Sequence, residues 1–223
     1  MKLKWFVLFV VILASFAQAA NPPMLKIGAK APDFNLPGVD GKNYSLKDFA
    51  DAKILVIIFT CNHCPTAQAY EQRIIKLYDD FKDKGMALVA ISPNDPSAVR
   101  LDELGYTDLS DSFEEMKVRA KERGYKFPYL YDGETQSTAK AYGVVATPHV
   151  YIFDQERTLR YVGRIDDSEV KTVTSQDARN AIEAMVAGKL VPVEVTKVFG
   201  CSTNGPTKPT ARKNHWPSGM PSR

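Results

Sequence analysis

Short apolar runs alternate with longer amphipathic stretches along this chain. The runs at 54–59 and 86–92 are continuous, apolar and rich in β-branched residues, which predicts strands buried on both faces. Between them, apolar residues recur at helical spacing from Ala67 to Phe81, and this predicts a helix that stops at Gly85. Strands and helices that alternate in this way indicate an α/β fold around one sheet.

The second half of the chain continues the alternation. Ser112 and Glu115 form a capping box at the start of a helix over 112–123, which Gly124 ends. A short polar turn separates two apolar segments and predicts an antiparallel hairpin, so the central sheet should be mixed and flanked by helices. The further predicted elements are a strand at 127–131, a helix at 135–142, the hairpin strands at 150–153 and 159–164, and a final helix at 177–187.

The two ends differ from this middle part. Lys2 and Lys4 precede an apolar stretch over 5–14, and a small-x-small sequence at 17–19 follows, which predicts a cleaved signal peptide over 1–19. The stretch is shorter than the about 20 residues of a spanning helix, so we expect an exported, periplasmic protein. Polar and small residues predominate from 200 to 223, which predicts a flexible tail. One domain is therefore expected over 26–195.

Charge and cysteine content restrict the function classes. Cleavage after Ala19 removes two lysines and lowers the net charge from +3 to +1, which gives no basis for a nucleic-acid partner. A domain of about 180 residues can bury a sufficient core without disulfide staples. The three cysteines are therefore expected to take part in chemistry.

The main chemical motif is Cys61-Asn62-His63-Cys64-Pro65, which lies where the first strand gives way to a helix. A helix N-terminus favours a thiolate, so we expect Cys61 to be an exposed nucleophile of lowered pKa and Cys64 to resolve the mixed disulfide. Asn62 and His63 would tune the reduction potential. A zinc site would need a second pair of ligands, and only Cys201, His149 and His215 remain, scattered along the chain, so we expect no metal and no cofactor.

A second motif, Thr147-Pro148, precedes the 150–153 strand. Proline cannot donate to a strand ladder, and a proline in this position favours a cis peptide bond.

Together these motifs resemble the thioredoxin fold. The segments 28–37, 40–42 and 45–49 are similar to the opening of redoxins, the branch that contains the alkyl hydroperoxide reductase and thiol-specific antioxidant (AhpC/TSA) proteins. The resemblance implies an N-terminal extension, an insert between Cys64 and Pro148, and a cis-proline loop that lies against the dithiol and binds the substrate's extended chain. It also implies that Thr147 contacts the sulfur atoms and stabilises a thiolate.

The chain departs from peroxiredoxins within this branch. They place the peroxide-attacking cysteine in Pro-x-x-x-Thr/Ser-x-x-Cys, whereas Ile54 and Ile58 occupy these positions before Cys61, and Ile57 and Cys61 before Cys64. The chain therefore resembles a peroxiredoxin-like subgroup with a thioredoxin-type Cys-x-x-Cys.

The sequence does not single out one residue as the proton acceptor for the cysteines. The aspartate that thioredoxin buries beneath its dithiol is not expected, because the strand holds apolar residues at 56–58. Glu71 is a candidate base, with a solvated helix carboxylate as the alternative. His149 would face the dithiol or point away as a structural or exposed histidine. Cys201 would act as a resolving thiol, a third ligand for a soft metal ion, or an incidental tail cysteine.

These features predict an exported thiol-disulfide oxidoreductase that cycles between the Cys61/Cys64 dithiol and disulfide. Its partners would be a disulfide-containing protein or small thiol, and a redox partner, which for a reductant in an oxidising compartment would be a membrane electron donor. The alternatives are a thiol peroxidase of unusual type, and a non-catalytic copper(I) carrier that uses Cys61 and Cys64 with His149 or Cys201. Spacing alone does not fix the direction of electron flow.

Overall fold

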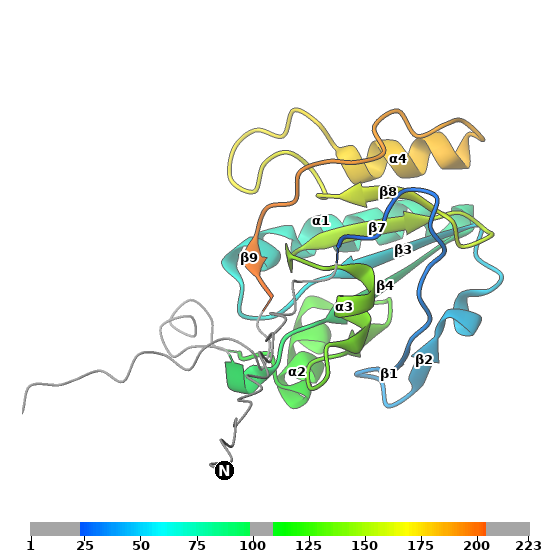
Figure 1. Cartoon of the computed structure of the whole chain (residues 1–223). Helices are drawn as coiled ribbons and strands as arrows, with labels where there is room; N and C mark the ends of the chain where they lie inside the picture. Colours follow the sequence, from blue (N-terminus) through cyan, green and yellow to red (C-terminus); the bar gives the residue numbers. More distant parts are fainter. Residues whose placement is uncertain (1–22, 99–108, 204–223) are drawn as a thin grey trace, which may run out of the picture.

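A five-stranded mixed sheet forms the centre of the molecule in the computed structural model, which describes residues 23–98 and 109–203 (Figure 1). The strand order is β5-β4-β3-β7-β8, with β3, β4 and β5 parallel and with β7 and β8 each antiparallel to the strand before it in this order. The strands are β3 (Ile54–Phe59), β4 (Met86–Ser92), β5 (Tyr129–Tyr131), β7 (His149–Phe153) and β8 (Leu159–Gly163). The predicted α/β class and mixed sheet are confirmed.

Helices cover both faces of this sheet. They are α1 (Pro65–Phe81), α2 (Phe113–Arg123), α3 (Ser137–Tyr142) and α4 (Asp177–Val186), and the 3-10 turns are Leu46–Phe49, Lys82–Lys84 and Pro96–Ala98. Two small ladders lie outside the sheet: β1 (Asn35–Pro37) pairs with β2 (Asn43–Ser45), and β6 (Ala146–Thr147) pairs with β9 (Cys201–Ser202).

Side chains of the central strand β3 alternate between two apolar clusters, and all six residues are buried. Val56 and Ile58 pack with residues of α1, α2 and α4, while Leu55, Ile57 and Phe59 pack with α3 and the N-terminal segment. Burial on both faces explains why the run is continuously apolar. The strand is therefore a rigid base for the residues that follow it.

Most predicted elements appear close to their expected limits. The strands at 54–59 and 86–92 and the antiparallel hairpin of β7 and β8 are confirmed, and Ser112 Oγ accepts a hydrogen bond from the Glu115 amide at 3.3 Å in the predicted capping box. Strand β5 and helix α3 each begin two residues later than expected. The predicted cis bond between Thr147 and Pro148 is present.

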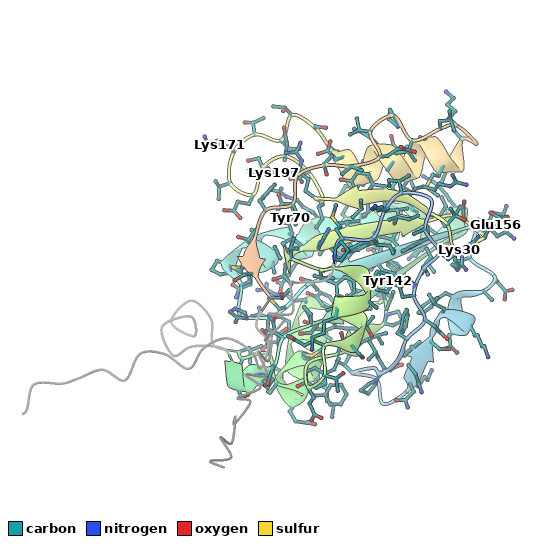
Figure 2. The ribbon with its side chains drawn as sticks, in the orientation of Figure 1. Lys30, Tyr70, Tyr142, Glu156, Lys171 and Lys197 are labelled. Atoms are coloured by element: carbon teal, nitrogen blue, oxygen red, sulfur yellow. A yellow bond between two sulfur atoms is a disulfide. The ribbon has the colours of Figure 1, made fainter. Side chains whose placement is uncertain are left out.

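The expected signal peptide at 1–19 lies outside the described residues, as does residue 204 onward of the expected tail. The beginning of that tail is ordered, since Cys201–Ser202 form β9. At the N-terminal end, Lys30 Nζ donates to the Glu156 carbonyl at 2.7 Å, which fastens the extension to the β7–β8 turn (Figure 2). Within the described ranges, no helix is both long and apolar enough to cross a membrane.

Candidate active site

The two cysteines of the motif lie in the short connection from β3 to α1. Cys64 is the N-cap of α1, and Pro65 occupies the first helical position, where its missing N–H costs nothing. Cys61 Sγ lies 3.1 Å from Thr147 Oγ1, and Cys64 Sγ lies 3.6 Å from the Thr147 carbonyl oxygen. The cis-proline loop, residues 146–148, therefore lies directly against both sulfur atoms, as the resemblance implied.

A disulfide joins Cys64 to Cys201, with the two Cα atoms 6.0 Å apart, and Cys61 is a free thiol. The bond seen here is thus different from the predicted Cys61–Cys64 disulfide. Cys201 reaches Cys64 because β9 pairs antiparallel with β6, which places Cys201 opposite Thr147. All three cysteines of the chain meet at one point.

The expectation that Cys61 is exposed and of lowered pKa is wrong for this state. Only 3% of Cys61 is accessible to solvent. Burial raises the pKa of this thiol well above its ordinary value, and the negative charge of Asp111 raises it further. Hydrogen bonds from Thr147 and Asn94 lower the pKa of Cys61, but by less than burial and Asp111 raise it.

Asn62 and His63 are buried and fixed by one carboxylate, that of Asp111. Its Oδ1 accepts hydrogen bonds from the backbone amides of Asn62 at 2.7 Å and His63 at 3.1 Å. Its Oδ2 lies 2.5 Å from His63 Nδ1 and accepts from Asn94 Nδ2 at 2.8 Å. The carboxylate is fully buried and holds the loop between the cysteines in place.

Asp111 is the residue that the sequence reasoning missed. Strand β3 carries no aspartate at 56–58, as expected, but a buried carboxylate that was not anticipated reaches the dithiol loop from the segment before α2. Its only signal in the sequence is its place just before the N-cap Ser112, which is also typical of an ordinary helix start.

One group of potential metal ligands occurs among the described residues, formed by Cys61, His63 and Asp111, whose ligand atoms lie within 4.8 Å of one another. The Asp111 oxygens, however, already accept from three N–H donors and contact the His63 ring. This geometry fits a hydrogen-bonded network, and an ion would enter only if the His63–Asp111 contact opened. The Cys64–Cys201 disulfide also removes two of the thiolates that a copper(I) site would need.

Glu71 lies on α1 and is only 3% exposed, so the solvated interpretation is wrong. Its carboxylate contacts Arg123 Nε at 2.7 Å and Arg119 Nε at 3.6 Å. Burial raises the pKa of Glu71, and the two arginines oppose that shift. Arg119 also donates to the Asn62 carbonyl at 3.4 Å, so Glu71 is connected to the dithiol loop through an arginine.

His149 is fully buried opposite Phe59, and its ring packs on Tyr151 with 4.5 Å between centroids. Burial lowers the pKa of His149 to about 3, so the ring is neutral at physiological pH. Its Nδ1 lies 3.3 Å from the Tyr151 hydroxyl. The structural interpretation of this histidine is confirmed.

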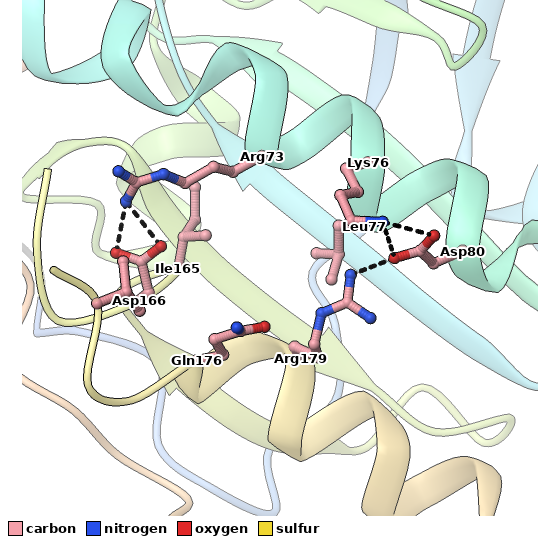
Figure 3. A pocket seen from close by; sticks show the side chains of 9 residues that line it. Arg73, Lys76, Leu77, Asp80, Ile165, Asp166, Gln176 and Arg179 are labelled. Atoms are coloured by element: carbon pink, nitrogen blue, oxygen red, sulfur yellow. Dashed lines mark hydrogen bonds and ion pairs between the residues drawn. The ribbon is translucent and has the colours of Figure 1, made fainter.

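A surface pocket of about 420 Å³ lies between α1 and α4 (Figure 3). Its charged side chains form ion pairs within the pocket, with Arg73 contacting Asp166 at 2.8 Å and Arg179 contacting Asp80. None of the three cysteines lines it. The thiol site is therefore the better candidate for chemistry.

Comparison with known proteins agrees with this geometry. The chain is 25% identical over 134 residues to the thiol-disulfide oxidoreductase ResA of Bacillus thuringiensis, a match covering 59% of this chain and 66% of that protein, slightly less than two thirds. It is 27% identical over 139 residues to the chloroplastic peroxiredoxin Q of Gentiana triflora, over 60% of this chain and 57% of that protein. Both names support a redox function.

Solved structures support the same fold. An uncharacterized conserved protein from Geobacillus kaustophilus is 38% identical and superimposes with a TM-score of 0.74, covering 83% of this chain and 95% of that one. Solved thiol-disulfide oxidoreductase and interchange proteins at 20% and 19% identity share the thioredoxin-like fold, with TM-scores of 0.51 and 0.53. The AhpC/TSA family model matches residues 27–162, so the chain belongs to the AhpC/TSA family.

Proposed function

We propose that this protein is an exported thiol-disulfide oxidoreductase. The observation that carries the proposal is the meeting of Cys61, Cys64 and Cys201 against the cis-proline loop, with one disulfide and one free thiol among them.

The residues of the site have separate roles in this proposal. The Cys61 thiolate attacks a substrate disulfide, which releases one substrate thiolate and leaves a mixed disulfide on Cys61. Reduced Cys64 then attacks Cys61 Sγ, which releases the second substrate thiolate and forms Cys61–Cys64. The Thr147 hydroxyl, 3.1 Å from Cys61 Sγ, stabilises the thiolate by donating a hydrogen bond.

Asp111 is the proposed proton acceptor in place of Glu71. Its carboxylate lies close to Cys61 and is buried, and within the described part of the chain its hydrogen-bond donors are two backbone amides and the Asn94 side chain, not an arginine. Such a setting suits a group that accepts a proton when a buried thiol must ionise. Glu71, by contrast, faces two guanidinium groups.

The proposed substrates are protein disulfides or small disulfides, and a second thiol partner, located in the membrane if the protein is a reductant, resets the centre. Export is supported by the basic and apolar residues over 2–14 and the cleavage pattern at 17–19. N-terminal sequencing of the protein recovered from the periplasm should begin at Ala20.

Insulin reduction in the presence of dithiothreitol tests the activity. Cys61→Ser should lose it by about a hundredfold or more, because no other residue supplies the attacking thiolate. Ser202→Ala is the matched control, since this exposed side chain lies next to Cys201, and it should stay within about twofold of wild type. Equal rates for Cys61→Ser and wild type would refute the proposal.

A thiol peroxidase is the second candidate, favoured by the peroxiredoxin relatives and by the threonine hydroxyl next to Cys61. Hydrogen peroxide consumption with a thiol reductant separates the two activities. A dithiol exchanger consumes little peroxide, whereas rapid consumption that disappears in Cys61→Ser would favour the peroxidase.

A further inference from the structure

The chain after β8 and α4 returns to the thiol site as one extended segment, residues 194–203, here called the C-terminal strap. Its first part pairs with β8: the Val162 amide donates to the Glu194 carbonyl at 2.9 Å, and the Thr196 amide donates to the Val162 carbonyl at 3.1 Å. Thr196 Oγ1 also accepts from the Arg164 amide at 3.0 Å. The strap is therefore anchored to the sheet well before it reaches the cysteines.

The middle of the strap packs on helix α1. The Phe199 ring lies against Tyr70, with 6.1 Å between centroids, and Figure 2 shows Tyr70 close to the part of the strap that carries Lys197. Tyr70 is itself fixed, because its hydroxyl donates to Asp166 at 2.8 Å. This contact directs the following residues toward the N-terminus of α1.

Gly200 allows the strap to approach the cis-proline loop closely. Its φ is +147°, and a Cβ added there would lie 2.1 Å from the Thr147 carbonyl oxygen. A larger residue would thus separate the strap from the loop. The next residue, Cys201, pairs with Thr147 and is bonded to Cys64.

We propose that Cys201 is a second resolving thiol, which the C-terminal strap delivers to Cys64. This inference rests on the proposed function. After substrate reduction has formed Cys61–Cys64, the Cys201 thiolate attacks Cys64 Sγ; the Cys64–Cys201 bond forms, the Cys61–Cys64 bond breaks, and Cys61 leaves as the thiolate. The step is an exchange without net oxidation, so it needs no further electron acceptor. The state with Cys64–Cys201 and a free Cys61 is its product.

The strap also occupies the edge of β6 that the substrate's extended chain would use. One edge of β6 can pair with only one strand at a time, so an extended substrate at this edge competes with residues 201–202. Tethering favours the strap, because its effective concentration near Cys64 is set by the chain and not by diffusion. The disulfide therefore closes the site after each turnover until a reductant opens it.

Rapid-quench mapping of the reduced full chain tests the order of bonds. The protein is mixed with oxidised glutathione, quenched with acid, alkylated with N-ethylmaleimide and digested for mass spectrometry. In wild type, Cys61–Cys64 should appear first and be replaced by Cys64–Cys201, whereas Cys201→Ser should stop at Cys61–Cys64. Persistent Cys61–Cys64 in wild type, with Cys201 alkylated at all times, would overturn the proposal.

Gly200→Ala keeps all three thiols and tests delivery by the strap. Displacing the strap from Thr147 should slow the conversion to Cys64–Cys201 by about tenfold or more. Gly188→Ala is the matched control, because Gly188 also has a positive φ, +66°, but nothing lies within 4 Å of an added Cβ. Equal conversion rates in these two variants would refute delivery by the strap.

The same mapping separates failure of this inference from failure of the proposed function. If glutathione never forms a mixed disulfide with Cys61 and no glutathione thiol is released, the proposed exchange activity fails, whatever bond Cys201 makes. If release occurs but Cys201 stays reduced, only the second resolving step fails.

Discussion

Asp111 and Glu71 are both buried carboxylates near the start of α1, and they differ in their partners. Asp111 accepts hydrogen bonds from the amides of Asn62 and His63 and contacts the His63 ring. Glu71 faces the guanidinium groups of Arg119 and Arg123. Two carboxylates of similar burial therefore differ in whether positively charged side chains surround them.

The difference matters for the thiols. Two arginines offset the charge of Glu71, so that its field at a distance is small, while the charge of Asp111 raises the pKa of Cys61. We therefore expect Glu71 and its two arginines to contribute to the free energy of unfolding, and Asp111 to control the reactivity of the Cys61 thiol. Substitution of each carboxylate by its amide separates these contributions.

Glu71→Gln should have the largest effect on stability. It removes the negative charge from between Arg119, which is buried, and Arg123, and breaking such a pair costs about 3 kcal/mol of unfolding free energy. Urea denaturation measures the loss. Lys76→Gln is the control, because its ion pair with Asp80 is exposed and should contribute less than about 0.5 kcal/mol. A loss of similar size in both variants would remove the distinction between Glu71 and a surface carboxylate.

The sequence predicts the frame around these two groups well because local patterns determine it. The apolar run at 54–59 is short and rich in β-branched residues, which favours a doubly buried strand, and the box of Ser112 and Glu115 starts α2 through contacts three residues apart. The cis bond at Pro148 follows from the position of a proline at the mouth of a strand. Each of these features depends on near neighbours in the chain.

The site itself depends on distant neighbours. Asp111 is 48 residues from His63, and nothing in its own surroundings distinguishes it from a residue that precedes any helix. Cys201 is 137 residues from Cys64 and lies at the start of a stretch whose composition is typical of a disordered tail. Only the topology, which brings the segment before α2 and the C-terminal strap to one end of the sheet, reveals these partners.

His149 extends the comparison to a buried group whose pKa is shifted by burial alone. That pKa is about 3 in the folded state and 6.5 in the unfolded chain, so below pH 6.5 the unfolded state binds a proton that the folded state does not. Stability from this group is complete above pH 6.5 and falls as the pH decreases toward 3, by about 2 kcal/mol between pH 7.5 and 5. In His149→Gln, the free energy of unfolding measured by urea denaturation should fall between pH 7.5 and 5 by about 2 kcal/mol less than in wild type. An equal fall in both proteins would contradict the low pKa of His149.

Asp111→Asn should have its clearest effect on the chemistry of Cys61. The test uses the Cys64→Ser/Cys201→Ser background, in which Cys61 is the only cysteine of the chain. Asparagine keeps the shape and one acceptor oxygen but removes the charge, so the pKa of Cys61 should fall and alkylation by iodoacetamide at pH 7 should become about tenfold faster.

Glu71→Gln in the same background is the matched control for that measurement, since it removes a carboxylate that is also buried but whose charge two arginines offset. Its alkylation rate should stay within about twofold of the parent, and the full pH profile should shift only in Asp111→Asn. If both profiles shift equally, the loop geometry and not the charge of Asp111 controls Cys61. If neither shifts, burial alone sets the pKa of Cys61, and Asp111 serves only to hold Asn62 and His63 in place.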